Sequence, residues 1–148
     1  MVEELEALYR ERLPDFTRAA TAIAGDRDAG GDAVQDAFAK ALRKRRRYRE
    51  GNLEAWVWRI VVNAARDAAR RQRRKATPPP IETRADELGL PLELLTERQR
   101  EVLFLHYYAD LDYATIADAL EISAGTVGAT LSTARQTLRD ALTKEVSR

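Results

Sequence analysis

Residues 51–75 carry the groups in this chain that are best suited to binding a polyanion. At 3.6 residues per turn, arginines and one amide fall on one side of a single helix, and apolar side chains fall on the other. The polar side holds Arg59, Asn63, Arg66, Arg70, Arg73 and Arg74, and the apolar side holds Leu53, Val57, Ile60, Val61, Ala64 and Ala68. Arginine neutralises phosphate whatever the base sequence, whereas the Asn63 amide has the donor and acceptor needed to read a base edge.

The alternative interpretation of this pattern is an ordinary solvated helix, because runs of charge usually lie at the surface. Against it, no acid follows the arginines at i+3 or i+4, and seven further cations lie between Lys40 and Arg49. The net charge is only +1, but residues 1–86 hold 19 cations against 14 acids, and residues 87–148 hold 6 against 10. The excess of cations therefore lies where the polyanion-binding helix is predicted.

Composition excludes several classes of protein. The chain has no cysteine, which excludes disulfides and thiolate metal sites, and no apolar run approaches the roughly 20 residues needed to cross a bilayer. It has no His/carboxylate cluster and no glycine-rich phosphate loop, so we expect no catalytic residue, no metal ligand and no cofactor. His106 stands alone and is interpreted as structural. We expect a soluble, cytoplasmic protein without a membrane partner.

Helical periodicity dominates the chain and no segment alternates as a strand would, which predicts an all-α fold. In the first half we expect one helix over 5–13, a second opened by Pro14, a turn over 28–31 and a third helix through Leu42, with Trp56 mainly in the core. Three consecutive prolines break the periodicity at 76–91, which we interpret as a linker. The prediction is therefore two small helical domains, residues 1–75 and residues 92–148.

The second half has the spacing of a helix-turn-helix over residues 116–131. Thr96 with Gln99 is expected to cap a first helix, Asp112 a helix over 113–120, and Ser123 the last helix, which runs to about Lys144. Any helical hairpin shows part of this pattern. The combination of small and apolar residues is more specific and favours DNA binding; it comprises Ala117, Leu120, Ile122, Val127 and Leu131.

Three motifs in one order resemble those of bacterial RNA polymerase sigma factors of the extracytoplasmic-function class, and the match covers nearly the whole chain. The first is DAVQDAF at 32–38, which is similar to the segment that docks on polymerase, and the second is AWVWRIVVNAARD at 55–67, which is similar to the minus-ten-reading helix. The third looks like the minus-35 domain and comprises LTERQREVL at 95–103, LDYATIA at 111–117 and GTV at 125–127. The resemblance implies a promoter-specificity subunit that binds core RNA polymerase and promoter DNA.

The resemblance also implies roles for individual residues. Asp32, Gln35 and Asp36, spaced i, i+3 and i+4 on one polar face, would dock on the clamp helices of the largest polymerase subunit. The minus-ten set is Arg46, Arg47, Tyr48, Arg59, Asn63, Arg66 and Arg70, in which the loop around Tyr48 would receive an unpaired base. The minus-35 set is Arg98, Arg100, Thr126, Ala129, Ser132 and Arg135. The beta flap of polymerase and an anti-sigma factor are further partners compatible with the resemblance.

Two departures from the family pattern fall in the second half. Family members commonly carry Lys or Arg and Ser where this chain has Gly128, Ala129 and Thr130, and a Glu where Thr115 stands. Long side chains supply the bidentate base contacts worth about 1–3 kcal/mol each, so residues 92–148 are expected to bind minus-35 DNA weakly. Three alternatives remain open: a stand-alone helix-turn-helix regulator, an enzyme, and a degenerate sigma-like protein that binds polymerase without activating it.

Overall fold

The computed structural model describes residues 1–49, 51–74 and 90–146, and every regular element in these ranges is a helix, which confirms the all-α prediction. The first half contains α1 (Val2–Ala24), α2 (Arg27–Arg43), the 3-10 turn η1 (Arg45–Arg47) and α3 (Leu53–Arg73). The second half contains the 3-10 turn η2 (Leu92–Leu94), α5 (Glu97–Tyr107), α6 (Tyr113–Leu120) and α7 (Ala124–Val146). The linker predicted over 76–91 lies outside the described residues, apart from Leu90 and Pro91, and the division into two domains stays a prediction.

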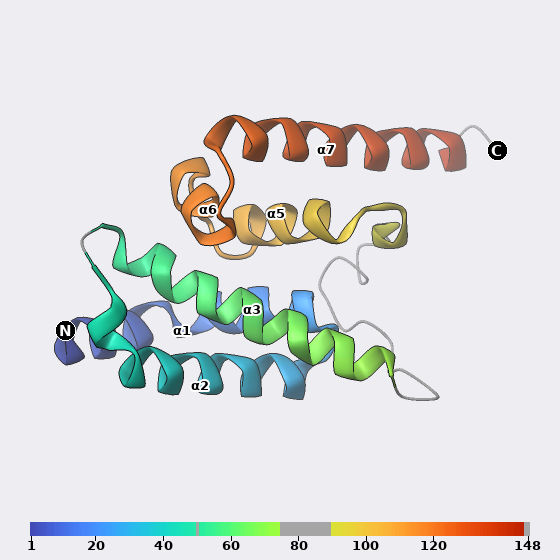
Figure 1. Cartoon of the computed structure of the whole chain (residues 1–148). Helices are drawn as coiled ribbons and strands as arrows, with labels where there is room; N and C mark the ends of the chain where they lie inside the picture. The colour runs from blue at the N-terminus through green and yellow to red at the C-terminus, as the bar shows by residue number, and fades with distance from the viewer. Residues whose placement is uncertain (50, 75–89, 147–148) are drawn as a thin grey trace.

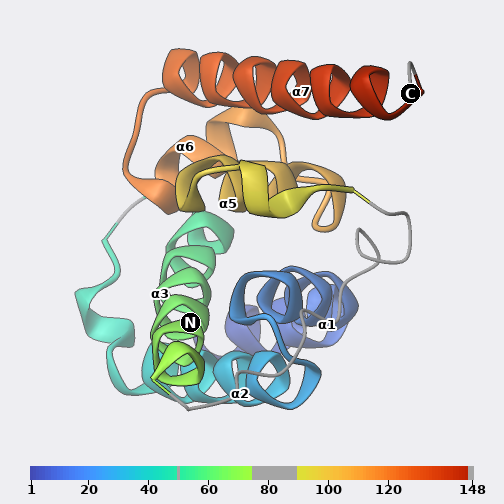
Figure 2. The same ribbon diagram turned by 90° about the vertical axis from the view of Figure 1, so that its right-hand side faces the viewer.

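The helices are stacked in layers (Figure 1). Helices α1, α2 and α3 pack together as one bundle, and α5 and α6 lie between that bundle and α7. The view from the side shows the same order, with α7 farthest from α2 (Figure 2). Helix α3 packs along α6, and α1 reaches α5, so the two halves are in direct contact.

Three aromatic rings form the centre of the first bundle. The Phe16 ring lies 4.2 Å from Trp58 and 5.2 Å from Phe38, measured between centroids, and the two phenylalanines meet edge to face. Trp58 is fully buried, whereas Trp56 is half-buried at the edge of the core beside Tyr48. The central tryptophan is therefore Trp58 and not Trp56, because the face of α3 turned toward α1 is the one that carries residue 58.

Two predicted boundaries in the first bundle are wrong. Helix α1 runs without interruption through Pro14, which is exposed, instead of ending before it. Leu5 and Phe16, on either side of Pro14, are both buried in one core, and this burial outweighs the roughly 3 kcal/mol cost of a proline inside a helix. Helix α2 begins at Arg27, because the Asp26 carboxylate accepts a hydrogen bond from the Ala29 amide at 2.8 Å, so residues 28–31 are helical and not a turn.

The second half begins its helices where the sequence predicts. Thr96 and Gln99 form a reciprocal capping box at the start of α5, with bonds of 3.2 and 3.0 Å. Asp112 accepts from the Thr115 amide at 2.8 Å, and Ser123 accepts from the Thr126 amide at 3.0 Å. The hydrogen bonds from the Thr115 side chain and amide lower the pKa of Asp112, because they stabilise its carboxylate. The predicted helix-turn-helix is thus present as α6 and α7.

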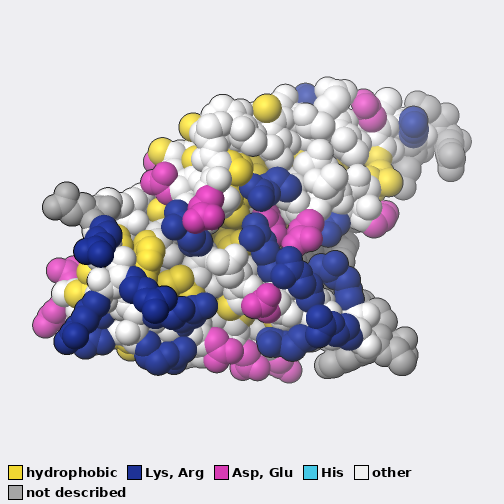
Figure 3. Space-filling view, in the orientation of Figure 1, with side chains coloured by type: hydrophobic (Ala, Val, Ile, Leu, Met, Phe, Trp, Pro, Cys, Tyr) yellow, Lys and Arg dark blue, Asp and Glu magenta, His cyan; other side chains and the backbone are white. Residues whose placement is uncertain are grey.

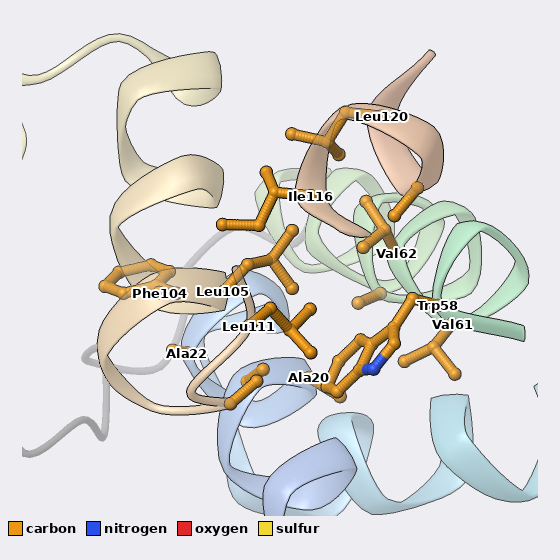
Figure 4. Packing of buried hydrophobic residues seen from close by; sticks show 14 of the residues in the cluster. Ala20, Ala22, Trp58, Val61, Val62, Phe104, Leu105, Leu111, Ile116 and Leu120 are labelled. Carbon is orange, nitrogen blue, oxygen red and sulfur yellow. The ribbon is translucent and has the colours of Figure 1, made fainter. Parts of the chain in front are cut away.

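The two halves share one hydrophobic core (Figure 4). Trp58 and Val62 of α3 lie in one cluster with Leu105, Leu111 and Ile116 of the second half. These five side chains are almost completely buried. Apolar burial stabilises by about 25 cal/mol per Å², so burial of these side chains stabilises the contact between the halves.

A close approach between α1 and α2 generates a test of this packing. A Cβ atom added at Gly30 would lie 2.5 Å from the Thr21 Cα atom, whereas one at Gly31 would meet nothing within 4 Å. We expect Gly30→Ala to lower the free energy of unfolding by about 1–3 kcal/mol through overpacking. Gly31→Ala, the matched control, should raise it by about 0.5–1 kcal/mol through helix propensity. Urea unfolding followed by circular dichroism checks both, and equal stability of the two variants would contradict the close approach.

Candidate nucleic-acid interface

Helix α2 presents the residues predicted to bind polymerase on its solvent side. Asp32, Gln35 and Asp36 are exposed, and the Gln35 amide donates to the Tyr9 hydroxyl at 2.8 Å. The opposite face of the helix buries Val34 and Phe38. Among the described residues, neither Asp32 nor Asp36 forms an ion pair. The exposed face of α2 is acidic and its opposite face is packed in the core, so the exposed face is suited to bind arginines of a partner.

The basic segment after α2 is exposed and crowded with charge. Arg46 and Arg47 lie in η1 with their side chains in solvent, and Arg45 donates to the Leu42 carbonyl at 2.6 Å. Repulsion, chiefly from Lys40, lowers the pKa of Lys44. Lys and Arg side chains gather over α2, η1 and α3 in the lower half of Figure 3, whereas the upper half shows few on this face. The structure thus concentrates positive charge on the first half.

Tyr48, predicted to receive a base, is tied to its own loop. Its hydroxyl donates to the Gly51 carbonyl, and its ring lies 5.5 Å from the Trp56 ring at an angle of 53°. Gly51 has a φ of 131°, a conformation that other residues rarely adopt. The Tyr48 and Trp56 rings lie next to each other and together form an aromatic pair at this loop.

The polar side of α3 divides into an exposed part and a covered part. Asn52 caps the helix by accepting from the Ala55 amide at 3.1 Å, and Asn63 and Arg70 lie exposed farther along. Arg70 pairs loosely with Asp67 at 3.5 Å, a contact of little energetic weight at the surface. Asn63 accepts from Arg66 at 3.2 Å through its oxygen.

Arg59 and Arg66 form the covered part, because they contact the second half. Arg66 binds both oxygens of Glu101, at 2.7 and 2.6 Å, and this hydrogen bonding raises the pKa of the guanidinium. Arg59 donates to the Asp118 carbonyl at 2.6 Å and pairs with Glu121 at 3.2 Å. No acid follows these two arginines at i+3 or i+4, and their acidic partners come from residues 35 or more positions away in the sequence.

A groove between α2 and α3 brings two predicted sites together. It is lined by Asp36, Lys40 and Arg43 from α2 and by Asn63, Asp67 and Arg71 from α3, over a floor of small apolar side chains. The proposed docking carboxylate Asp36 and the proposed base-reading amide Asn63 therefore face one surface. The sequence placed them in separate motifs 27 residues apart and gave no signal of this proximity.

The predicted minus-35 residues fall into different environments. Arg98, Thr126, Ala129 and Ser132 are exposed, whereas Arg100 is half-buried and donates to the Leu95 carbonyl at 2.8 Å. The structure thus brings Thr126, Ala129 and Ser132 together on the N-terminal half of α7, and it uses Arg100 to hold η2.

Two tyrosines missed by the sequence analysis line the same part of the second half. Arg135 donates to the Tyr107 hydroxyl at 2.8 Å, and this bond raises the pKa of Arg135. A Cβ atom added at Gly128 would lie in van der Waals contact with the Tyr113 ring, 3.4 Å from its nearest atom. The surface beside α7 is therefore built from aromatic rings and one arginine. Tyr113 lay within a quoted motif, but its spacing from Gly128 in the folded chain was not readable from the sequence.

His106 has a structural role, as predicted, because its Nδ1 atom lies 3.2 Å from the Leu111 carbonyl at the end of α5. Among the described residues, no group of three His, Cys, Asp or Glu side chains is placed to hold a metal ion. In the same part of the chain, no helix has both the length and the apolar character needed to cross a bilayer.

Comparisons with known proteins match both halves. Residues 8–75 match the family model for Sigma-70 region 2, and residues 86–138 match the model for Sigma-70, region 4. The ECF RNA polymerase sigma factor SigE of Mycolicibacterium smegmatis is 27% identical over 161 residues, which cover 96% of this chain and 63% of that protein. The chain thus spans less than two thirds of the length of this curated relative.

Two solved structures have a similar fold. CnrH, solved in complex with the cytosolic domain of CnrY, superposes with a TM-score of 0.75 at 23% identity, over 97% of this chain and 90% of that one. The sigma factor RpoE from Bartonella quintana, solved with the anti-sigma factor NepR, gives a TM-score of 0.72 at 23% identity, over 95% and 98% of the two chains. The likeness includes both halves of this chain.

Arg98 and Arg100 of α5 allow a test of which predicted minus-35 residues stabilise the fold. Arg100→Ala should lower the free energy of unfolding by about 1–3 kcal/mol, because it leaves the buried carbonyl of Leu95 without its donor. Arg98→Ala removes the same charge from an exposed position and should change stability by less than about 0.5 kcal/mol. Thermal and urea unfolding measure both variants. If Arg100→Ala unfolds like Arg98→Ala, Arg100 is available for DNA.

Proposed function

Because this chain belongs to the sigma-70 family, we propose that it is a sigma factor of the extracytoplasmic-function class, which binds core RNA polymerase and directs it to promoters. The observation that carries the proposal is the occurrence of both sigma-70 regions in one chain, in the order region 2 and then region 4. Each region has a surface suited to its role: an acidic and a cationic face in the first half, and a helix-turn-helix in the second.

Polymerase binding is assigned to the exposed face of α2. Asp32 and Asp36 have no ion-pair partner among the described residues, so their carboxylates are available to arginines of the clamp helices. Charge-assisted hydrogen bonds of this kind are about twice as strong as neutral ones. The second half would meet the beta flap, which would hold it over the upstream element.

Promoter reading is assigned to α3 and the basic loop before it. Arg46, Arg47 and Arg70 would hold phosphates, and the Asn63 amide would contact a base edge. An unpaired base of the non-template strand would be held at the Tyr48–Trp56 pair, because base–aromatic stacking is worth about 1–3 kcal/mol and tolerates any base. Capture of unpaired bases would stabilise the opened DNA.

Recognition of the upstream minus-35 element is assigned to α7, which would contribute little to the affinity for DNA. The exposed side chains of Thr126, Ala129 and Ser132 are short, so they provide few of the donors that read the major groove. Arg135 is half-buried and Tyr107 and Tyr113 are exposed, so these longer side chains would add contacts. Binding of core polymerase would therefore be needed to place α7 on its element.

A regulatory protein is a further proposed partner, because the similar sigma factor RpoE was solved with the anti-sigma factor NepR. We assign no catalytic step to the chain and place its action in the cytoplasm, with polymerase. The alternatives of a stand-alone helix-turn-helix regulator and of a sigma-like protein without activity make different predictions for transcription.

Run-off transcription tests the function directly. Purified chain added to cognate core polymerase should give defined transcripts from a promoter library, whereas core alone should not. Co-elution with core but no transcript would favour the degenerate sigma-like alternative. Sequence-specific DNA binding without any association with core would favour the stand-alone regulator.

The exposed residues of α3 allow base reading to be separated from phosphate binding. In reconstituted holoenzyme, Asn63→Ala should lose about 1–3 kcal/mol of discrimination at one minus-ten position. Arg70→Ala should weaken all promoters alike and reduce the salt dependence, since Arg70 has only a loose surface partner. A library measurement at two salt concentrations compares them. A uniform loss for Asn63→Ala would remove its base-reading role.

Charge reversal on α2 tests the docking face. Asp36→Lys should weaken binding to core polymerase at least about tenfold, because it opposes the cations expected on the partner. Glu11→Lys makes the same charge change at an exposed position of α1 and serves as the control. Surface-immobilised core gives both dissociation constants, and equal values for the two variants would remove Asp36 from the interface.

A further inference from the structure

One of the three predicted docking residues of α2 has a partner on another helix. The Gln35 side chain donates a hydrogen bond from its Nε2 atom to the Tyr9 hydroxyl of α1 at 2.8 Å. The two residues lie 26 positions apart, so the bond depends on how α1 packs along α2. The fold therefore controls how one residue of the docking face is presented to a partner.

This hydrogen bond decides which end of the Gln35 amide is turned away from α1. The oxygen and nitrogen ends of a side-chain amide have nearly the same shape, so hydrogen bonding sets its orientation. Because the NH2 group is bonded to Tyr9, the Oε1 atom is the end turned away from that hydroxyl. Gln35 is exposed, so a partner protein can reach this oxygen.

An oxygen at this point matches the two carboxylates beside it. Asp32 and Asp36 precede Gln35 by three positions and follow it by one, and both are exposed. An ionised carboxylate only accepts hydrogen bonds, whereas a guanidinium only donates them. A face that presents acceptors from all three residues is therefore suited to arginines. An outward NH2 group at Gln35 would oppose a donor to the donors of the partner.

The Tyr9 ring is itself held by the core of the first bundle. It is half-buried, and its centroid lies 5.0 Å from that of Phe38 at an angle of 81° between the rings. Phe38 in turn meets the fully buried Phe16 edge to face. Edge-to-face contacts favour one orientation of a ring, so the Tyr9 hydroxyl stands at a defined point beside Gln35.

We propose that Tyr9 is a positioning residue for polymerase binding, which keeps the Gln35 amide oxygen turned toward the clamp helices. The inference rests on the assignment of the exposed face of α2 to polymerase under the proposed function. Tyr9 acts through Gln35 and needs no contact of its own with the partner. The expected contribution is that of one neutral hydrogen bond at the surface, about two- to fivefold in the dissociation constant.

The test removes the Tyr9 hydroxyl and keeps its ring against Phe38. Tyr9→Phe should raise the dissociation constant of the full-length chain for immobilised core polymerase about two- to fivefold. Tyr108→Phe is the matched control, because Tyr108 is also half-buried and stacks on another ring, that of Phe104, in the second half. The control should bind core like the parent chain. Urea unfolding checks that both variants are folded.

Two changes at Gln35 separate orientation of the amide from any other role of the hydroxyl. Gln35→Glu introduces a carboxylate, both ends of which accept, so no group remains to be oriented. Gln35→Ala removes the polar group altogether. In either background, Tyr9→Phe should have no effect on core binding. The double-mutant cycle with Gln35→Ala should therefore give a coupling equal to the whole effect of Tyr9→Phe.

The other outcomes overturn the proposal in distinguishable ways. An equal effect of Tyr9→Phe in all three backgrounds would show that the hydroxyl contacts polymerase itself or supports the fold. An effect that is lost with Gln35→Ala and kept with Gln35→Glu would show that Tyr9 acts on residue 35 by means other than orientation.

Unchanged binding by Tyr9→Phe, with weaker binding by Gln35→Ala, would show that the amide needs no positioning. If Gln35→Ala itself binds core like the parent chain, Gln35 lies outside the interface and the role of Tyr9 is lost with it. Failure of the parent chain to bind core polymerase would instead count against the proposed function.

Discussion

Burial of Trp58 is the constraint on which the rest of the arrangement depends. The ring is fully buried against Phe16, and its indole nitrogen donates to Glu54 at 3.4 Å. Glu54 in turn pairs with Arg12, which donates to the Ala109 carbonyl of the second half at 2.8 Å. One buried side chain therefore fixes the rotation of α3 and connects it, through two polar residues, to the other half. Arg59, Asn63 and Arg66 follow at about 80–140° around the helix from Trp58.

The choice of arginine at the covered positions has a physical reason. A planar guanidinium matches a carboxylate in a forked geometry, with two parallel N–H donors to two oxygens. A lysine at residue 66 would act as a point charge and would lose the two parallel bonds to Glu101. The same interface is apolar at its centre and ionic at α3, so its strength depends on salt only in part.

The sequence was sufficient for the features that local chemistry determines. The caps at Thr96, Asp112 and Ser123 placed three helix starts correctly, because each depends on residues within four positions. Pro14 misled the prediction because the burial that carries the helix through it comes from other parts of the chain. The turn predicted at 28–31 failed for a related reason: Gly30 is needed for contact with Thr21 and not for a bend.

The types of residue in the candidate site could be predicted from the sequence. The contacts between residues that are far apart in the sequence could not. Amphipathic spacing identified the stripe of α3, and two sigma-70 regions were apparent from their motifs. No local rule predicts the contact of Arg66 with Glu101 or the groove that Asp36 and Asn63 share, since both depend on how the helices cross. Trp56, expected mainly in the core, is half-buried against it, whereas the full burial of Trp58 was not predicted.

Tyr113 packs against the position of Gly128. A Cβ atom added at residue 128 would lie 3.4 Å from the nearest atom of that ring, which is ordinary van der Waals contact. Contacting residues rarely have additive effects, so a substitution at 128 is expected to have a different consequence before and after a change at 113. The side chains that position 128 of α7 tolerates during evolution therefore depend on the residue that stands at 113.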